Sequence, residues 1–471
     1  MSKNKPPAET TRGRSPESVT PQERVEYGLS LRESTPLESH AEWSPGPERL
    51  DPVQLIEEQN RDRLSWLVPV RRARMSVSAF TFYRGAARIM ARDLGPTPVS
   101  TLQVQLCGDA HLSNFGVYAS PERRLVFDLS DFDETLPGPW EWDVKRLATS
   151  FFIAGRFNGL DRKRSRRLAR RTARSYRKSM AKFAGMRTME VWYSLIEAQN
   201  AIENVENKRV QHKGKKTIDK ALSKDSLQAL DRLAVEVDGE YQIRHDPPLI
   251  VRVRDIREES ARVAIRDHLE QSFADYLRSV PDHVEHLLRQ FRPVDFAIKV
   301  VGVGSVGTRC FITLLQGRDR GDPLFLQTKE AGPSVLEEVL PASRYETSGQ
   351  RIVEGQRMMQ TVSDIFLGHV ATTTGRDFYM RQLKDWKGSA DVENASAKGL
   401  LHSAELRGWT LARAHARTGD PVALAAYLGD GKTFDRAVAE FSERYAGQNA
   451  QDYEAFREEI RAGRLDASEY E

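Results

Sequence analysis

Two short segments in the first third of the chain contain residues that could support phosphoryl transfer. GDAHLSN, at residues 108–114, contains Asp109 and Asn114, and SDFDE, at residues 130–134, contains Asp131. Phosphoryl transfer to a hydroxyl group needs a carboxylate that accepts the proton, and oxygen ligands that hold magnesium against the phosphates. A turn with Asp and Asn beside a second turn with Asp supplies both kinds of group. The alternative is that these residues only form turn hydrogen bonds.

His111, in the middle of the first segment, is also open to two interpretations. It could be a metal ligand of the metallophosphoesterase kind, or it could form hydrogen bonds within the turn. Two-metal sites need several further His and Asp ligands in short motifs. Of the ten histidines, only His111 stands among carboxylates, which favours the structural role.

Strands are expected to position both acidic segments. Residues 99–106, VSTLQVQL, alternate as a strand does and lead directly into GDAHLSN. Residues 123–129, RRLVFDL, form a second short predicted strand that leads into SDFDE. The sequence therefore places each acidic segment at the end of a strand.

A glycine-rich segment lies much further along the chain. Gly302, Gly304 and Gly307 form GVGSVG after the apolar run FAIKVV. In a dinucleotide-binding fold these glycines would open a helix, but the residues that follow, TRCFITLL, are typical of a strand. In kinases, instead, two strands joined by a glycine turn cover the phosphates of the nucleotide.

The next predicted strand, LFLQTKEA, places Lys329 among apolar neighbours. From there a long cation could reach phosphate oxygens and pair with a glutamate on a helix, as in kinases. QRIVEGQRMMQ, at residues 350–360, offers Glu354 for that pair, and Glu338 is a weaker candidate. The alternative is that Lys329 is an ordinary lysine at a strand edge.

Length and composition limit the classes of protein that fit. The 471 residues are enough for two or three packed units. With 71 basic and 67 acidic residues the net charge is +4, so no overall field indicates a nucleic-acid coat or a membrane binder. Cys107 and Cys310 are too few for a disulfide framework or a four-thiolate zinc site, which fits a reducing cytoplasm. Without a signal segment or about 18 consecutive apolar residues, the chain is predicted to be neither secreted nor membrane-spanning.

Composition divides the chain into five segments. Residues 1–50 are rich in Pro, Ser, Glu and Arg and are predicted to be a disordered tail. Residues 51–155 contain the acidic segments, 156–290 form a helical, basic insertion, 291–390 form a β-rich lobe with the glycine turn, and 391–471 return to helix.

The insertion contains two runs of basic residues. The first, RKRSRRLARRTARSYRKSMAKFAGM, starts at residue 162, and the second, KGKKTIDKALSK, starts at residue 213. Such runs could hold phosphate-bearing polymers, but aromatic residues are sparse and no nucleic-acid-binding fold accompanies them. Solvated helix faces and packing against acidic partners are favoured, and no nucleic acid is expected as a partner.

Several of these motifs resemble known families. GDAHLSN, DFDE and GPWEWDVKRLA resemble motifs of the aminoglycoside phosphotransferase and choline kinase type of protein-kinase-like fold. This resemblance implies that Asp109 is the catalytic aspartate, that Asn114 and Asp131 hold magnesium, and that Asp143 supports the catalytic loop, with Asp133 in a supporting role. More specifically, FYRGAA, CGDAHLSNFG, DFDET, QTKEA, EGQRMMQ and LARAHARTGD resemble the bacterial domain of unknown function 2252, over about residues 50–460.

The order of the motifs differs from that of kinases. The acidic segments precede the glycine turn and Lys329, but read cyclically the elements follow the kinase order. This implies an α+β, two-lobed, protein-kinase-like fold that is circularly permuted and carries added helices. If so, Lys329 faces Asp131 across a cleft, the glycine turn covers that cleft, and the helix at 400–417 packs beside the strand at 99–106.

The sequence thus predicts a phosphotransferase that uses ATP and magnesium to modify an unidentified hydroxyl-bearing acceptor. Cys107 stands where phosphotransferases of this type usually have histidine, and no lysine follows Asp109 as in protein kinases. The alternative is therefore a catalytically silent, nucleotide-binding regulatory module. The sequence does not determine the oligomeric state.

Overall fold

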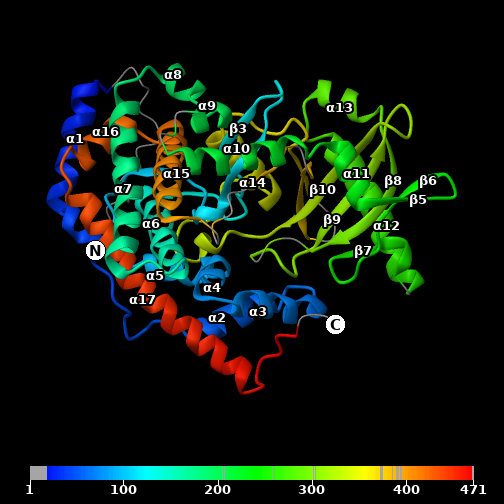
Figure 1. Ribbon diagram of the computed structural model, residues 1–471, viewed down its shortest axis with the longest axis horizontal. Coiled ribbons are helices and arrows are strands. Elements are labelled where there is room, and N and C mark those ends of the chain that lie inside the picture. The colour runs from blue at the N-terminus through cyan, green and yellow to red at the C-terminus, as the bar shows by residue number, and fades with distance from the viewer. Residues whose placement is uncertain are drawn as a thin grey trace, which may run out of the picture.

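The computed structural model describes residues 19–468, except for 204, 206, 257, 301, 303, 372–374, 384–385, 389–391 and 393–394. Figure 1 shows long helices packed together on one side and an antiparallel sheet on the other. The chain is therefore α+β, as predicted. None of the described helices is both long and apolar enough to cross a membrane.

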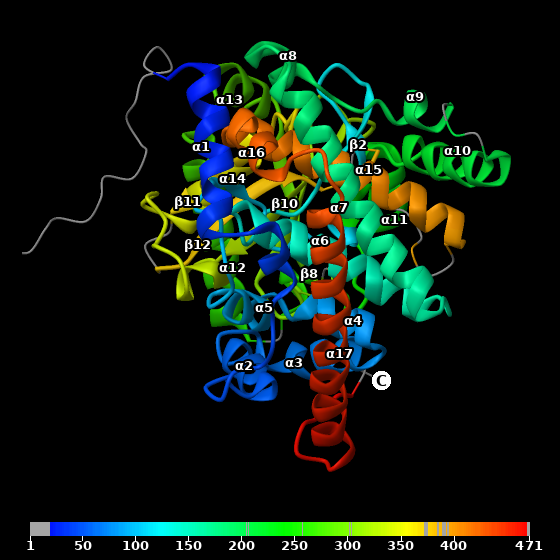
Figure 2. The ribbon, with the colours of Figure 1, turned by 90° about the vertical axis from the view of Figure 1, so that its left-hand side faces the viewer.

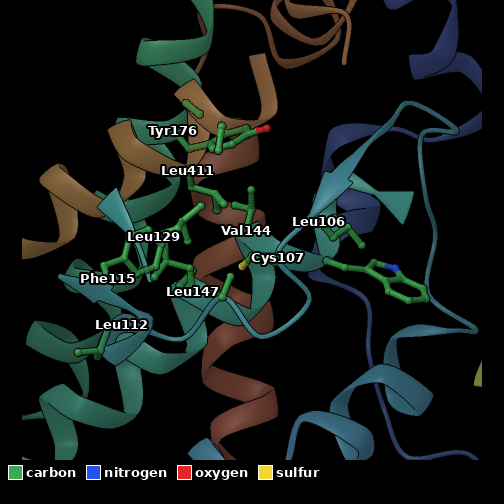
Figure 3. Packing of buried hydrophobic residues seen from close by; sticks show 14 of the residues in the cluster. Leu106, Cys107, Leu112, Phe115, Leu129, Val144, Leu147, Tyr176 and Leu411 are labelled. Atoms are coloured by element: carbon green, nitrogen blue, oxygen red, sulfur yellow. The ribbon is translucent and has the colours of Figure 1, made fainter. Parts of the chain in front are cut away.

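Six of the described helices form one packed group around an apolar core. They are α1 (Pro21–Ser34), α6 (Trp140–Phe157), α7 (Arg162–Ala184), α15 (Ala397–Thr418), α16 (Pro421–Leu428) and α17 (Thr433–Arg461). In this core, Val144 and Leu147 of α6 belong to one cluster with Tyr176 of α7 and Leu411 of α15 (Figure 3). Cys107, just after the first predicted strand, belongs to the same cluster, so the helices support the loop that follows it.

The prediction of a disordered tail is wrong for the part of the tail that forms α1. Thr20 caps the helix and forms a reciprocal capping box with Glu23, which satisfies otherwise free backbone donors. Arg32 then donates hydrogen bonds to the carbonyl oxygens of Ala426 and Tyr427 on α16. Local capping and packing thus order a segment that has few large apolar residues. Residues 1–18 of the predicted tail lie outside the described residues.

The sheet region is built from six antiparallel strands in the order β11-β12-β10-β9-β8-β7. They are β7 (Ile250–Arg252), β8 (Arg292–Lys299), β9 (Cys310–Gln316), β10 (Pro323–Ala331), β11 (Gly368–Ala371) and β12 (Asp377–Gln382). A helix, α14 (Ser348–Met359), connects β10 to β11. The strand, glycine turn and strand expected around residues 302–307 are therefore present as β8 and β9.

Helices cover both faces of the sheet because its apolar residues alternate in direction. Phe296 and Phe311 pack in one cluster with α12 (Glu259–Leu277) and α13 (Asp282–Leu288). Their sequence neighbours Ala297 and Ile312 pack in another cluster with α11 (Ser226–Leu233). The sheet is therefore a buried layer.

The predicted helical insertion also contains strands, which corrects the prediction for residues 156–290. Besides α8 (Thr188–Tyr193), α9 (Ala198–Glu203) and α10 (Lys208–Leu222), it includes β5 (Ala234–Val237), β6 (Glu240–Ile243) and β7. Asp238 and Gly239 both have positive φ, 51° and 79°, and these angles suit a two-residue hairpin turn. The Asp-Gly pair between β-branched residues is the local signal for this hairpin.

The segment with the acidic residues consists of short helices and two small ladders. It contains α2 (Pro52–Asn60), α3 (Val68–Ser76), α4 (Ala79–Gly85), α5 (Ala87–Leu94), β1 (Gln103–Leu106), β2 (Phe115–Ala119), β3 (Leu125–Leu129) and β4 (Leu136–Pro139). β1 pairs with β4, and β2 pairs with β3. The two predicted strands are thus present, and each ends at an acidic segment.

The end of α15 packs beside β1, as the permuted order predicted. The Oγ1 of Thr418 accepts a hydrogen bond from the amide of Gln105, at 3.1 Å. Gly419 comes so close that a Cβ there would lie 3.0 Å from the carbonyl oxygen of Gln103. The C-terminal helix therefore ends against the strand that leads to GDAHLSN.

A buried ion pair fixes α15 to β3. Arg413 of α15 pairs with Asp128 of β3, and the two side chains are 1% and 3% exposed. Arg413 also donates to the carbonyl oxygen of Met359, and Asp128 accepts from the amide of Thr361. Breaking such a pair leaves one buried charge without compensation.

Asp128→Ala is therefore expected to lower the free energy of unfolding by about 3–5 kcal/mol, because Arg413 stays buried without its carboxylate. Urea-induced unfolding measures this change. Asp231→Ala, on the exposed surface of α11, is the matched control, with an expected change within about 0.5 kcal/mol. Equal, small losses for both variants would contradict the assignment.

Candidate functional site

The two acidic segments meet at Gly108. This glycine has φ of +81°, and a Cβ at this position would lie 2.2 Å from the carbonyl oxygen of Glu134. Only glycine allows both the left-handed backbone and so close an approach. The amide of Ser130 also donates to the carbonyl oxygen of Asn114, at 3.0 Å, so the segments are joined at the end of the β2–β3 ladder.

Asp143, in the first turn of α6, holds the backbone of the first segment. Its carboxylate accepts hydrogen bonds from the amides of Cys107 (2.8 Å) and Gly108 (3.1 Å). His415 of α15 lies 3.2 Å from the same carboxylate and 2.9 Å from the hydroxyl of Tyr176. The contact expected between Asp143 and the loop is confirmed, and α15 and α7 take part in it.

The carboxylate of Asp109 is held by an arginine. The Nε of Arg146, on α6, lies 2.5 Å from Asp109 Oδ1. Burial raises the pKa of the Asp109 carboxyl, although Arg146 opposes this change. Asn114 donates from its amide to the carbonyl oxygen of Asp109, at 2.7 Å. Asp109 and Asn114 are thus brought together.

His111 forms hydrogen bonds within the turn. Its Nδ1 accepts from the amide of Ser113 at 3.2 Å, and its Nε2 lies 3.7 Å from Asp109 Oδ2. Burial lowers the pKa of His111, so the ring is neutral near pH 7. Among the described residues, no three His, Cys, Asp or Glu residues are grouped to hold a metal ion. These contacts agree with the structural interpretation.

The second segment meets Lys329 of β10 across 196 residues of sequence. Lys329 forms an ion pair with Asp133, and its Nζ lies 4.0 Å from Asp131 Oδ1. The hydroxyl of Tyr379, on β12, donates to Asp133 at 2.8 Å. Lys329 and Asp131 are therefore close in space, and Asp133 is the direct partner of the lysine.

The charges of this cluster shift one another's pKa values. Burial and the neighbouring Asp133 raise the pKa of Asp131. Burial acts on Asp133 in the same direction, but Lys329 outweighs it and lowers the pKa of Asp133. Burial alone would lower the pKa of Lys329, yet Asp131 and Asp133 together raise it. At neutral pH, the lysine is charged.

The glycine turn lies over the acidic cluster, as predicted. Ser305 donates from its hydroxyl to Asp133 Oδ2 at 3.5 Å. Gly307 has φ of +90°, and its carbonyl oxygen accepts from the amide of Leu64 at 2.8 Å. A Cβ on Gly304 would lie 3.7 Å from the carbonyl oxygen of Arg84, and the exposed Gly302 has φ of +29°. The turn is thus anchored on the segment before the first acidic turn.

The predicted pair of Lys329 with a helix glutamate does not form. Glu354 of α14 pairs with Arg357 at 2.8 Å. Glu338, the weaker candidate, pairs with Arg88 and Arg92. Asp133 already occupies the position beside Lys329, so a helix carboxylate is not needed there.

Sequence reasoning missed several residues of the site. Arg146 holds Asp109, Tyr379 holds Asp133, and Arg351 of α14 donates to the carbonyl oxygens of Asp133, Thr135 and Gly332. A usable signal existed for Arg146, because a charged residue inside the largely apolar helix WDVKRLATSFFIAG must find a buried partner. For Tyr379 and Arg351 the sequence carries no comparable signal.

A family comparison supports the grouping of these motifs. Residues 63–459 match the family described as "Uncharacterized protein conserved in bacteria (DUF2252)". The chain belongs to this family. No match was found among curated proteins or among solved structures. The matched range includes every site residue discussed above, so the candidate site lies within the part of this DUF2252 chain that matches the family.

Asn114 and Asp131 suit a magnesium ion in this DUF2252 chain. Both are hard oxygen donors at the same end of the β2–β3 ladder, and the Asp131 side chain is 35% exposed. Magnesium is usually held by one or two carboxylates, waters and substrate phosphates. The donor set therefore fits the metal if a nucleotide supplies phosphate oxygens.

Glu134, the last residue of the second segment, supports the loop after β10. Its Oε2 accepts from the amide of Val335 at 2.7 Å, and its carbonyl oxygen accepts from the hydroxyl of Ser334 at 2.9 Å. Burial raises the pKa of Glu134 from 4.5 to about 7. The folded protein therefore retains a proton that the unfolded chain releases.

Because of this raised pKa, the protein is expected to lose stability as the pH rises from 4.5 to about 7. Glu134→Gln should remove this part of the pH dependence, since the amide keeps an acceptor for Val335 but does not ionise. Urea unfolding of both proteins at several pH values measures the difference. Parallel pH profiles for the two proteins would contradict the assignment.

Proposed function

We propose that this DUF2252 chain is a phosphotransferase that uses ATP and magnesium and has a circularly permuted, kinase-like fold. The observation that carries the proposal is the meeting of Lys329 with Asp131 and Asp133. Sequence proximity does not bring them together. In kinases, a strand lysine and a metal-binding aspartate lie near each other because the lysine and the metal both contact the phosphates of one nucleotide.

The order of elements supports the same proposal. Starting at β8, the chain passes through the glycine turn, β9, Lys329 on β10, α14, β11 and β12, and then α15. The end of α15 lies against β1, and β1 leads to Asp109 and Asn114. Read from β8, this order is the one expected of a circularly permuted kinase-like fold in which the cut lies between α15 and the catalytic loop.

Each residue has a role in the proposed reaction. Magnesium, held by Asn114 and Asp131, would supply positive charge that the transferred phosphoryl group requires. Lys329 would bind phosphate oxygens, and Asp133 and Tyr379 would keep its ammonium group in position. Asp109 would accept the proton of the acceptor hydroxyl, while Arg146 fixes the orientation of its carboxylate.

A catalytically silent nucleotide-binding module is the second candidate. The contact that favours it is the 2.5 Å hydrogen bond from Arg146 to Asp109. Arg146 occupies one oxygen of this carboxylate and opposes the rise of its pKa, so the carboxylate is a weaker proton acceptor than it would be without the arginine. In this case nucleotide binding would persist without transfer.

The protein is expected to consume ATP only with magnesium, and Asp109→Asn is expected to abolish this turnover while ATP affinity changes little. The amide cannot accept the proton, but the phosphate contacts remain. ATP consumption measures turnover, and the label that reaches the acceptor, from ATP with either α- or γ-phosphate label, separates nucleotidyl from phosphoryl transfer.

Asp319→Asn, an exposed change of the same chemistry, is the matched control and should keep wild-type turnover. Wild-type turnover in the Asp109 variant would contradict the catalytic role. ATP binding without any turnover in the wild-type protein would support the silent module instead.

Asp131→Ala should weaken ATP binding only when magnesium is present, because its carboxylate acts through the metal. Asp133→Ala should weaken binding with and without magnesium, because it releases Lys329. Calorimetric titration with ATP, with magnesium and with a chelator, measures both effects. If Asp131→Ala lost the same affinity without metal, the ligand role would be wrong.

A further inference from the structure

The basic helix α7 divides into paired and unpaired cations. Arg166 pairs with Glu443 at 3.2 Å, Arg171 pairs with Glu405, and Arg177 pairs with the buried Asp435 at 2.8 Å. This confirms that part of the helix packs against acidic partners. The side chains of Arg167, Arg170 and Arg174 form no ion pair or hydrogen bond with the described residues.

The unpaired arginines share one face of the helix and line a cavity. Positions 167, 170, 171 and 174 follow the helical spacing of three and four, so their side chains project together. With Lys432, at the start of α17, they surround a cavity of about 230 Å³. Figure 2 shows the beginning of α17 against α7.

The floor of this cavity is rigid. Asp435 is fully buried and receives two hydrogen bonds from Arg177, at 2.8 and 3.0 Å. Arg177 also donates to the carbonyl oxygen of Asp430, which fixes the turn before α17. The one carboxylate that lines the cavity is therefore already neutralised. No side chain caps the N-terminus of α17, and that end of a helix carries partial positive charge.

We propose that this cavity binds a compact anion with several phosphate groups. Arg167, Arg170, Arg174 and Lys432 around one hollow repel one another unless anions lie between them, and the guanidinium fork suits phosphate oxygens. The site is separate from the acidic cluster at Asp131, and the proposal does not depend on the proposed function.

The residues that line the cavity favour a small polyphosphate over a nucleic acid. Single strands are bound through aromatic side chains that stack on the bases, and the lining contains no aromatic residue. The volume of the cavity, about 230 Å³, also suits a compact ligand. A linear tripolyphosphate is therefore a suitable probe.

Calorimetric titration of the full-length protein with sodium tripolyphosphate, without magnesium, tests the proposal. The variant R167Q/R170Q/R174Q is expected to bind about tenfold more weakly or worse, because each lost guanidinium removes charge-assisted hydrogen bonds. These arginines are exposed, and glutamine keeps helix propensity. The matched control K215Q/K216Q/K220Q changes the charge equally on exposed positions of α10, the other basic run, and should bind within about twofold of wild type.

Two further measurements separate this cavity from other sites. Lys329→Met should bind tripolyphosphate as the wild type does, which excludes the proposed nucleotide cleft as the source of the signal. A single-stranded oligonucleotide should not displace the probe at equal phosphate concentration. The proposal is overturned if the wild type does not bind, if both triple variants lose affinity equally, if only Lys329→Met loses it, or if the oligonucleotide displaces the probe.

Discussion

The ion pair between Lys329 and the second acidic segment joins the two halves of this protein. Lys329 lies on a central strand of the sheet and is 3% exposed, so its charge needs a close partner. Asp133 supplies that partner, and Tyr379 and Ser305 bind the same carboxylate. One carboxylate therefore receives contacts from β10, β12 and the glycine turn, which places all three against the N-terminal acidic segments. Asp131, next to it, stays partly exposed and available for a ligand.

A second network holds the first acidic segment from behind. Tyr176, His415 and Asp143 form a buried chain that ends on the backbone amides of Cys107 and Gly108. Satisfied polar chains of this kind resist rearrangement, because breaking one contact exposes several buried groups. Since His415 belongs to a C-terminal helix and Asp143 to an N-terminal one, the loop depends on both ends of the chain. This dependence accounts for the packing of α15 against β1.

Charged side chains are arranged differently in the acidic cluster and along helix α7. Near Lys329, cations and carboxylates are buried in pairs, so Asp133 holds the ammonium group of the lysine in one position. Along α7, Arg167, Arg170 and Arg174 have no acidic partner among the described residues, and the proposed anion would bind there without displacing a carboxylate. The paired charges near Lys329 favour fixed positions of the side chains. The arginines along α7 favour accumulation of negative charge from bound anions.

Much of the local structure is determined by the sequence itself. The strands at residues 103–106 and 125–129, the turns at GDAHLSN and SDFDE, and the strand, glycine turn and strand near residue 304 are all present. These features depend on side-chain period and backbone freedom, which neighbouring residues decide. Even the missed hairpin β5–β6 carried a local signal in Asp238 and Gly239.

Only the tertiary structure decided which charges meet. Sequence pattern suggested that Lys329 would pair with Glu354, but Asp133 is its partner, and Glu354 pairs with Arg357. A charged Arg146 inside an apolar helix indicated a buried partner, but not that the partner would be Asp109, and no pattern indicated that α1 would pack on α16. Such choices depend on which buried charges lie nearest once the chain has folded. Because the cost of an unpaired buried charge is set by all its neighbours together, residue order along the chain cannot determine the partner.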